Sequence, residues 1–145
     1  MTLYADPSVL LPYYREEPAS AAVEALFMGQ STPVVISELS RVEFASALAR
    51  WVRMGELTEP QANRVESAFY EDVSEGRFDV RAVTGDMFQR AHYWLLTRRT
   101  NLRTLDSLQL ACAEVSEASF VTLDEDLFEA AEFLGLPTHR FAGPG

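Results

Sequence analysis

Four acidic residues, far apart along the chain, stand where their carboxylates could act together. Asp6 and Asp124 each follow a short apolar run that predicts a buried strand. Glu43 and Asp106 lie on predicted helices, in line with apolar residues that would face the core. Several carboxylates in one pocket repel one another unless cations neutralise them, and oxygen ligands suit Mg²⁺ or Mn²⁺. The set therefore predicts a divalent-cation site.

Each of these acids also has a simpler explanation. Asp6, Asp106 and Asp124 all stand where an aspartate could cap the N-terminus of a helix, which is a common role for this residue. Glu43, taken alone, suits a solvated or ion-paired position on a helix. These explanations account for each acid taken alone. They do not explain why one acid follows each of two strands while the other two share apolar helix faces.

The composition narrows both the fold and the chemistry. A length of 145 residues suits one domain, and 48% hydrophobic residues can build a core. All 12 basic residues are arginine, which excludes a P-loop and other lysine-dependent phosphate sites, and the dispersed glycines do not support a Gly-x-Gly-x-x-Gly dinucleotide site. A formal charge of −10 disfavours general nucleic-acid binding. Cations held by carboxylates can still bring a phosphodiester to an acidic pocket.

The single cysteine, Cys112, excludes an internal disulfide and suits a reducing compartment. The first residues lack the basic and apolar regions of a signal peptide, and no later run approaches the ~18 apolar residues of a membrane helix. We therefore expect a soluble, cytoplasmic protein with no membrane segment.

Apolar runs and turn residues predict an α/β fold, a mostly parallel sheet with helices on both faces. The predicted strands are 3–5, 33–36, 78–83 and 119–123, with a last edge strand at 137–141. The predicted helices begin at Pro7 and then cover 18–29, 37–54, 58–76, 84–99, 106–115 and 124–134. Residues 1–141 would form a single domain and 142–145 a flexible tail. Ligands bind outside the carboxyl ends of strands in such a sheet, where Asp6 and Asp124 are expected.

Four segments in order resemble the PIN-domain ribonucleases, in particular the VapC toxins of toxin–antitoxin pairs. The segments are 4–8, 37–48, 102–113 and 120–127, followed by two alanines and Gly-Leu, and the resemblance covers nearly the whole chain. It implies a PIN-like fold in which Asp6, Glu43, Asp106 and Asp124 form the catalytic, metal-binding quartet. Mg²⁺ or Mn²⁺ held there would activate a water to hydrolyse RNA. Asp6 and Asp106 correspond to the family's most dependable ligands.

The resemblance also assigns supporting roles around the quartet. Ser8 and Thr122 match small hydroxyl positions that help order the site, and Asp126 is a lower-ranked rival or supplement to Asp124. Because the arginine fork matches phosphate oxygens, Arg41 and Arg103 are candidate RNA contacts, although both could equally be ordinary surface charges.

The same resemblance implies three partners: a cognate antitoxin protein, an RNA substrate and a second copy of the chain in a homodimer. The antitoxin would place a helical segment in an apolar groove between the early helices. Two alternatives stay open. The chain could be a PIN-like scaffold that binds RNA or protein without cutting, or a PIN nuclease that processes DNA or structured RNA.

Overall fold

A four-stranded parallel sheet forms the centre of the protein in the computed structural model, which describes residues 2–141. The strand order is β3-β2-β1-β4, and the predicted tail at 142–145 lies outside the described residues. The strands are β1 (Leu3–Ala5), β2 (Val34–Ser37), β3 (Phe78–Arg81) and β4 (Ser119–Val121). The predicted α/β class with a parallel sheet is confirmed.

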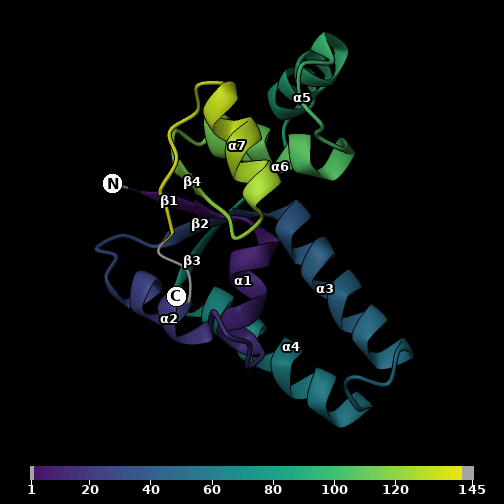
Figure 1. Cartoon of the computed structure of the whole chain (residues 1–145). Coiled ribbons are helices and arrows are strands. Elements are labelled where there is room, and N and C mark those ends of the chain that lie inside the picture. The colour runs from purple at the N-terminus through teal and green to yellow at the C-terminus, as the bar shows by residue number, and fades with distance from the viewer. Residues whose placement is uncertain (1, 142–145) are drawn as a thin grey trace.

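Helices follow the strands and lie on both sides of the sheet (Figure 1). They are α1 (Pro7–Tyr14), α2 (Ser20–Met28), α3 (Glu38–Arg53), α4 (Glu59–Ser74), α5 (Gly85–Thr97), α6 (Thr104–Val115) and α7 (Glu125–Phe133). Among the residues described, no helix combines the length and the apolar character needed to cross a membrane.

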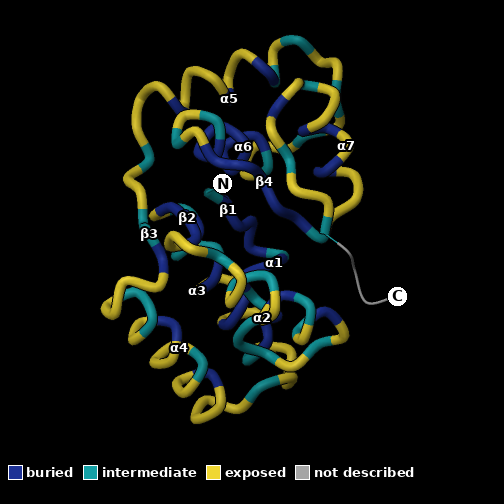
Figure 2. Tube along the Cα trace, turned by 90° about the vertical axis from the view of Figure 1, so that its left-hand side faces the viewer, coloured by how far each residue is buried: buried dark blue, intermediate teal, exposed yellow. Residues whose placement is uncertain are grey.

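Alternating strand residues build two separate cores. Tyr4, Val35 and Phe120 point to one face, where α5, α6 and α7 cover them. Leu3 and Ile36 point to the other face, which packs against α1, α2, α3 and α4. Figure 2 shows β1, β2, β4 and α6 as mainly buried segments, with helices around them that are exposed on their outer sides. Cys112 of α6 is fully buried in the core that includes Tyr4 and Phe120.

The order of the strands defines where a ligand can approach. β1, β2 and β3 follow one another toward one edge of the sheet, whereas β4 pairs with the other side of β1. The connections therefore diverge at the carboxyl ends of β1 and β4, and such a switch point leaves a crevice there. Asp6 directly follows β1, and its register partner would be Thr122, because Ala5 pairs with Val121.

Several predicted boundaries were wrong. The predicted edge strand at 137–141 is only a single bridge between Phe120 and Thr138, because Pro137 has no N–H to donate and contributes only its carbonyl. The helix predicted from Pro18 begins at Ser20, whose hydroxyl accepts a hydrogen bond from the Glu17 N–H and closes a turn first. The third and fourth strands end at Arg81 and Val121, two residues earlier than predicted.

Candidate active site

Asp6 occupies the N-cap of α1 at the end of β1, and only 7% of the residue is exposed. Its Oδ2 accepts hydrogen bonds from Ser8 Oγ (2.7 Å), Thr122 Oγ1 (2.9 Å) and the Ser8 N–H (3.3 Å). Burial nevertheless raises the pKa of Asp6 to about 6, because loss of water outweighs these bonds. The predicted cap is confirmed, but it occupies one carboxylate oxygen, and Oδ1 accepts no hydrogen bond from another described residue.

The hydroxyls of Ser8 and Thr122 join the two strand ends around Asp6. Ser8 Oγ donates to Asp6 and accepts from the Leu123 N–H at 2.9 Å. Thr122 Oγ1 donates to Asp6 and accepts from the Asp124 N–H at 3.0 Å. Each hydroxyl therefore fixes the Asp6 carboxylate and the segment after β4 at once.

Glu43 is held from inside the core by a residue that the sequence analysis missed. Gln109, buried in α6, donates from Nε2 to Glu43 Oε1 at 2.8 Å and accepts a hydrogen bond from the Tyr4 hydroxyl at Oε1. Burial raises the pKa of Tyr4, which keeps this hydroxyl protonated as a donor. These two hydrogen bonds orient the Gln109 amide with its nitrogen toward Glu43 and its oxygen toward Tyr4. The sequence does contain a signal for Gln109, because it is a polar residue within the otherwise apolar run that follows Asp106.

The aspartates of α6 and α7 line a small pocket of about 180 Å³. Its walls are Asn101, Leu102, Arg103, Asp106, Asp124, Asp126 and Leu127. Asp124 is the N-cap of α7 and accepts from the Leu127 N–H at 3.2 Å, as predicted. Asp106 is not the cap of its helix: α6 begins at Thr104, and Asp106 lies in the first turn and accepts a hydrogen bond from the Arg103 N–H at 3.3 Å. The predicted helix start at 106 was wrong, because Arg103 takes the N-cap position.

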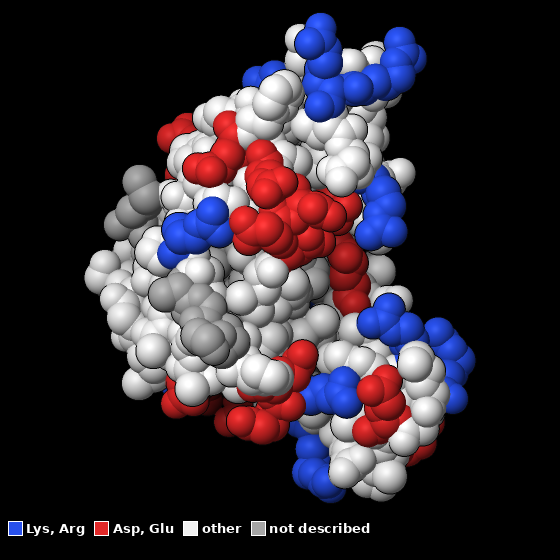
Figure 3. Space-filling model, in the orientation of Figure 1, with Lys and Arg blue, Asp and Glu red and all other residues white. Residues whose placement is uncertain are grey.

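Electrostatic coupling connects the acids into one group. The charge of Glu43 raises the pKa of Asp6, and that of Asp106 raises the pKa of Glu43, whose own burial is the larger cause. Asp106 shares the pocket with Asp124, whose backbone N–H is tied through Thr122 to Asp6. Figure 3 shows a continuous acidic patch in the middle of this face, where the first turns of α3, α6 and α7 approach one another in Figure 1. The structure therefore brings the four predicted acids to one region.

A family model for the PIN domain matches residues 3–134. The chain belongs to the PIN domain family. No curated protein sequence matches this PIN domain. Its fold is similar to that of Mycobacterium tuberculosis VapC20, described as a sarcin–ricin loop cleaving toxin, at 15% identity and a TM-score of 0.70 over 96% of this chain and 99% of that chain.

Two further solved structures share the fold of this PIN domain. FitAcB from Neisseria gonorrhoeae has 16% identity and a TM-score of 0.70, covering 96% of this chain and 97% of its own. A toxin–antitoxin complex from Klebsiella pneumoniae has 15% identity and a TM-score of 0.62, and the match covers 87% of this chain and 89% of that chain. At these identities the likeness concerns the fold alone.

The described acids of this PIN domain do not form a preassembled metal-binding cluster. In residues 2–141, no three His, Cys, Asp or Glu side chains are arranged around one point so as to hold a metal ion directly. The acids come from different elements: Asp6 is the N-cap of α1, Glu43 lies in α3, Asp106 in α6, and Asp124 is the N-cap of α7.

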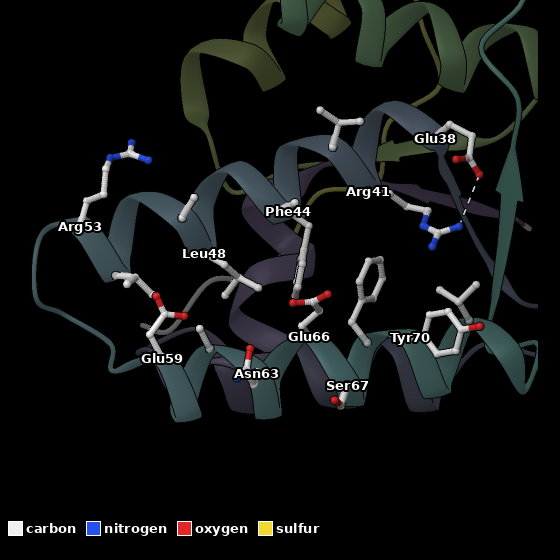
Figure 4. A pocket seen from close by; sticks show the side chains of 17 residues that line it. Glu38, Arg41, Phe44, Leu48, Arg53, Glu59, Asn63, Glu66, Ser67 and Tyr70 are labelled. Carbon is white, nitrogen blue, oxygen red and sulfur yellow. Dashed lines mark ion pairs between the residues drawn. The ribbon is translucent and has the colours of Figure 1, made fainter.

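The two candidate RNA-contacting arginines of the PIN domain lie in different places. Arg103 lines the acidic pocket, is 88% exposed, and stands 3.8 Å from Asp106 Oδ2. Arg41 pairs with Glu38 at 3.7 Å and lines a separate groove of about 940 Å³ between α3 and α4 (Figure 4). The pocket therefore brings Arg103 beside the acids but not Arg41.

Proposed function

We propose that this PIN domain is a metal-dependent endoribonuclease that hydrolyses RNA phosphodiester bonds and acts as the toxin of a toxin–antitoxin pair. The observation that carries the proposal is the gathering of Asp6, Glu43, Asp106 and Asp124 at the switch point of the sheet. Burial and mutual repulsion raise the pKa values of Asp6 and Glu43 there. Capping of α1 and α7 does not require such an arrangement.

The donor set fits a hard divalent cation. It consists of carboxylate oxygens, which Mg²⁺ and Mn²⁺ prefer, and a cation would relieve the repulsion that raises these pKa values. Mg²⁺ usually keeps several waters and is held by one or two carboxylates, so it does not need three side chains around one point. A cation bound there lowers the pKa of a water molecule and stabilises negative charge on phosphate.

The protein's own residues have distinct parts in this proposal. Ser8 and Thr122 fix Oδ2 of Asp6 and leave Oδ1 for a ligand. Gln109 fixes Oε1 of Glu43 in the same way. Asp106 and Asp124 face the open pocket where a phosphate could enter, and Asp126 lines the same pocket as an alternative fourth acid.

Two structural neighbours support the toxin role, and two surfaces of the chain support the proposed protein partners. VapC20 is described as a toxin, and the Klebsiella pneumoniae structure as a toxin–antitoxin complex. The groove between α3 and α4 is lined by Phe44 and Leu48 among others, and could receive a helix of a cognate antitoxin. Exposed Phe88 and Leu96 on α5 offer an apolar surface to a second copy in a homodimer.

Cleavage of RNA by the purified chain tests the proposal. With Mg²⁺ or Mn²⁺ we expect the wild type to cut single-stranded RNA and EDTA to stop the reaction. Asp106→Asn should reduce cleavage at least ~100-fold without unfolding the protein. Asp86→Asn removes an exposed acid in the first turn of α5 and should leave cleavage unchanged.

Expression of the chain alone should also arrest growth. The toxin proposal fails if the wild type cuts no RNA with either metal and does not arrest growth. RNA or protein binding without cleavage would instead indicate a scaffold, and selective cutting of DNA or structured RNA would indicate a processing nuclease.

A further inference from the structure

Two arginines at the end of α5 differ from most others in the chain. The majority of its arginines stand within ion-pair distance of an Asp or Glu, as Arg90 does with Glu114 at 2.6 Å. Arg98 and Arg99 are both exposed, and no described carboxylate pairs with either of them. In a chain of charge −10, adjacent cations without an acidic partner form a local positive site.

These arginines belong to the same loop as one wall of the acidic pocket. The α5–α6 loop, residues 98–103, starts with Arg98 and Arg99 and ends with Asn101, Leu102 and Arg103, which line the pocket. Five residues of chain span at most roughly 18 Å, so the arginines lie within a few nucleotides of the pocket. Figure 3 shows arginine side chains over α5 at the top of the face that carries the acidic patch.

The backbone conformation at Arg98 favours glycine, whereas its place at the end of α5 favours a cation. Arg98 has φ 54° and ψ 32°, the left-handed conformation that glycine adopts freely. In this conformation the Cβ of any residue other than glycine lies close to the following carbonyl oxygen. Glu117 after α6 has the same φ of 54°, so this fold tolerates the conformation at helix ends, and the dipole at the end of α5 favours a cation at position 98.

The chemistry of the loop favours a phosphate ligand. A nucleic acid that approaches the acidic pocket meets carboxylates that repel it, so it needs cations beside the pocket to hold it. Guanidinium groups bind phosphate oxygens in a bidentate manner and remain charged at any relevant pH. The pocket is small and mainly polar in its walls, which suits a nucleotide backbone better than an apolar protein segment.

We propose that the α5–α6 loop binds the backbone of single-stranded RNA next to the bond to be cut. Arg98 and Arg99 contact phosphates outside the pocket, while Arg103 and Asn101 contact the nucleotide at its edge. The inference rests on the proposed ribonuclease function and names the surface that guides its substrate.

Fluorescence anisotropy with a short labelled single-stranded RNA of mixed sequence tests the loop directly. All proteins carry Asp6→Asn to prevent cleavage, so that binding is measured separately from activity. Arg98→Ser/Arg99→Ser should weaken RNA binding about tenfold or more. It should also reduce the slope of log K against log salt by about 1.4, the value for two lost phosphate contacts on a single strand.

A control variant loses two positive charges at positions outside the α5–α6 loop. Arg50 on α3 and Arg64 on α4 are also exposed and have no described acidic partner. Arg50→Ser/Arg64→Ser should change RNA affinity less than twofold. If both double variants show the same affinity and salt slope, the loop does not guide RNA, even where the wild type cleaves RNA as proposed.

Arg98→Gly separates RNA binding from folding. Because glycine relieves the left-handed backbone, the free energy of unfolding should stay equal or rise while RNA affinity falls. Unchanged RNA affinity in this variant and in Arg98→Ser/Arg99→Ser would overturn the inference, as would binding of duplex DNA in place of RNA. Loop-dependent RNA binding by a wild type that cuts no RNA would support the inference and reject the nuclease.

Discussion

The side-chain nitrogen of Gln109 donates a hydrogen bond of 2.8 Å to the carboxylate of Glu43. The amide oxygen of Gln109 accepts from the buried Tyr4 hydroxyl, and a flipped amide would turn this oxygen toward the Glu43 carboxylate, where two acceptors would face each other. A residue of the core thus orients a carboxylate in the crevice. Glu43 itself needs this support, because burial and Asp106 both raise its pKa.

We expect Gln109→Leu to destabilise the protein by about 1–3 kcal/mol, since it removes the donor to Glu43 and one of the acceptors near the buried Tyr4 hydroxyl, another being Ser37 Oγ. The pKa of Glu43 should rise further, because the hydrogen bond from Gln109 lowers it. Urea unfolding and carboxyl NMR titration measure the two effects. In the double variant with Tyr4→Phe, the cost should be less than the sum of the single costs; strict additivity would show that the two side chains are not coupled.

Asp6→Asn should make stability less dependent on pH. The pKa of Asp6 is about 6 in the folded protein against 3.8 for the free side chain, so the folded state holds its proton more tightly. Wild-type stability should therefore fall as the pH rises from about 4 to above 6, by at most roughly 3 kcal/mol from this group. Asn can still cap α1 and does not titrate.

Urea unfolding in EDTA between pH 4 and pH 8 measures this effect. Relative to the wild type, Asp6→Asn should gain stability with rising pH, whereas Asp86→Asn should follow the wild type. A stability difference that stays constant across this range would contradict the assigned burial of the Asp6 charge.

Thr122→Val should remove hydrogen bonds that connect the ends of β1 and β4. The valine keeps the shape but neither donates to Asp6 nor accepts from the Asp124 N–H. We expect a loss of about 1–3 kcal/mol in unfolding free energy and a higher pKa for Asp6, because the lost hydrogen bond lowers it. The pKa is read by NMR; a lower value for Asp6 would disprove the assigned role of the threonine.

Arg103→Ser and Arg41→Ser should differ in RNA cleavage. Arg103 lines the acidic pocket, whereas Arg41 lies in the groove between α3 and α4. We expect Arg103→Ser to raise KM for RNA about tenfold and Arg41→Ser to change it less than twofold. Steady-state kinetics on one RNA substrate compare the variants; equal effects would remove the assignment of Arg103 to the substrate path.

Local sequence signals were enough to predict most of the helices and strands. Pro7 after Asp6 and Ser37 before a long amphipathic run mark helix starts that the structure confirms. Such signals depend on neighbouring residues, since caps, proline and apolar periodicity act within one or two turns. They misplaced the start of α6, where Arg103 takes the N-cap and the Asp106 carboxylate, three residues later, accepts a hydrogen bond from the Arg103 N–H.

The resemblance named Ser8 and Thr122 as supporting residues, but only the tertiary structure decided which atoms each acid meets, and it alone added Gln109. The sequence predicted parallel strands but not the order β3-β2-β1-β4, which places Thr122 beside Asp6 across 116 positions. Likewise, the contact between Gln109 and Glu43 joins α6 to α3 across the sheet end, and no local pattern contains it. Side-chain identity determined what each group can donate or accept, whereas the packing of distant elements decided which groups meet.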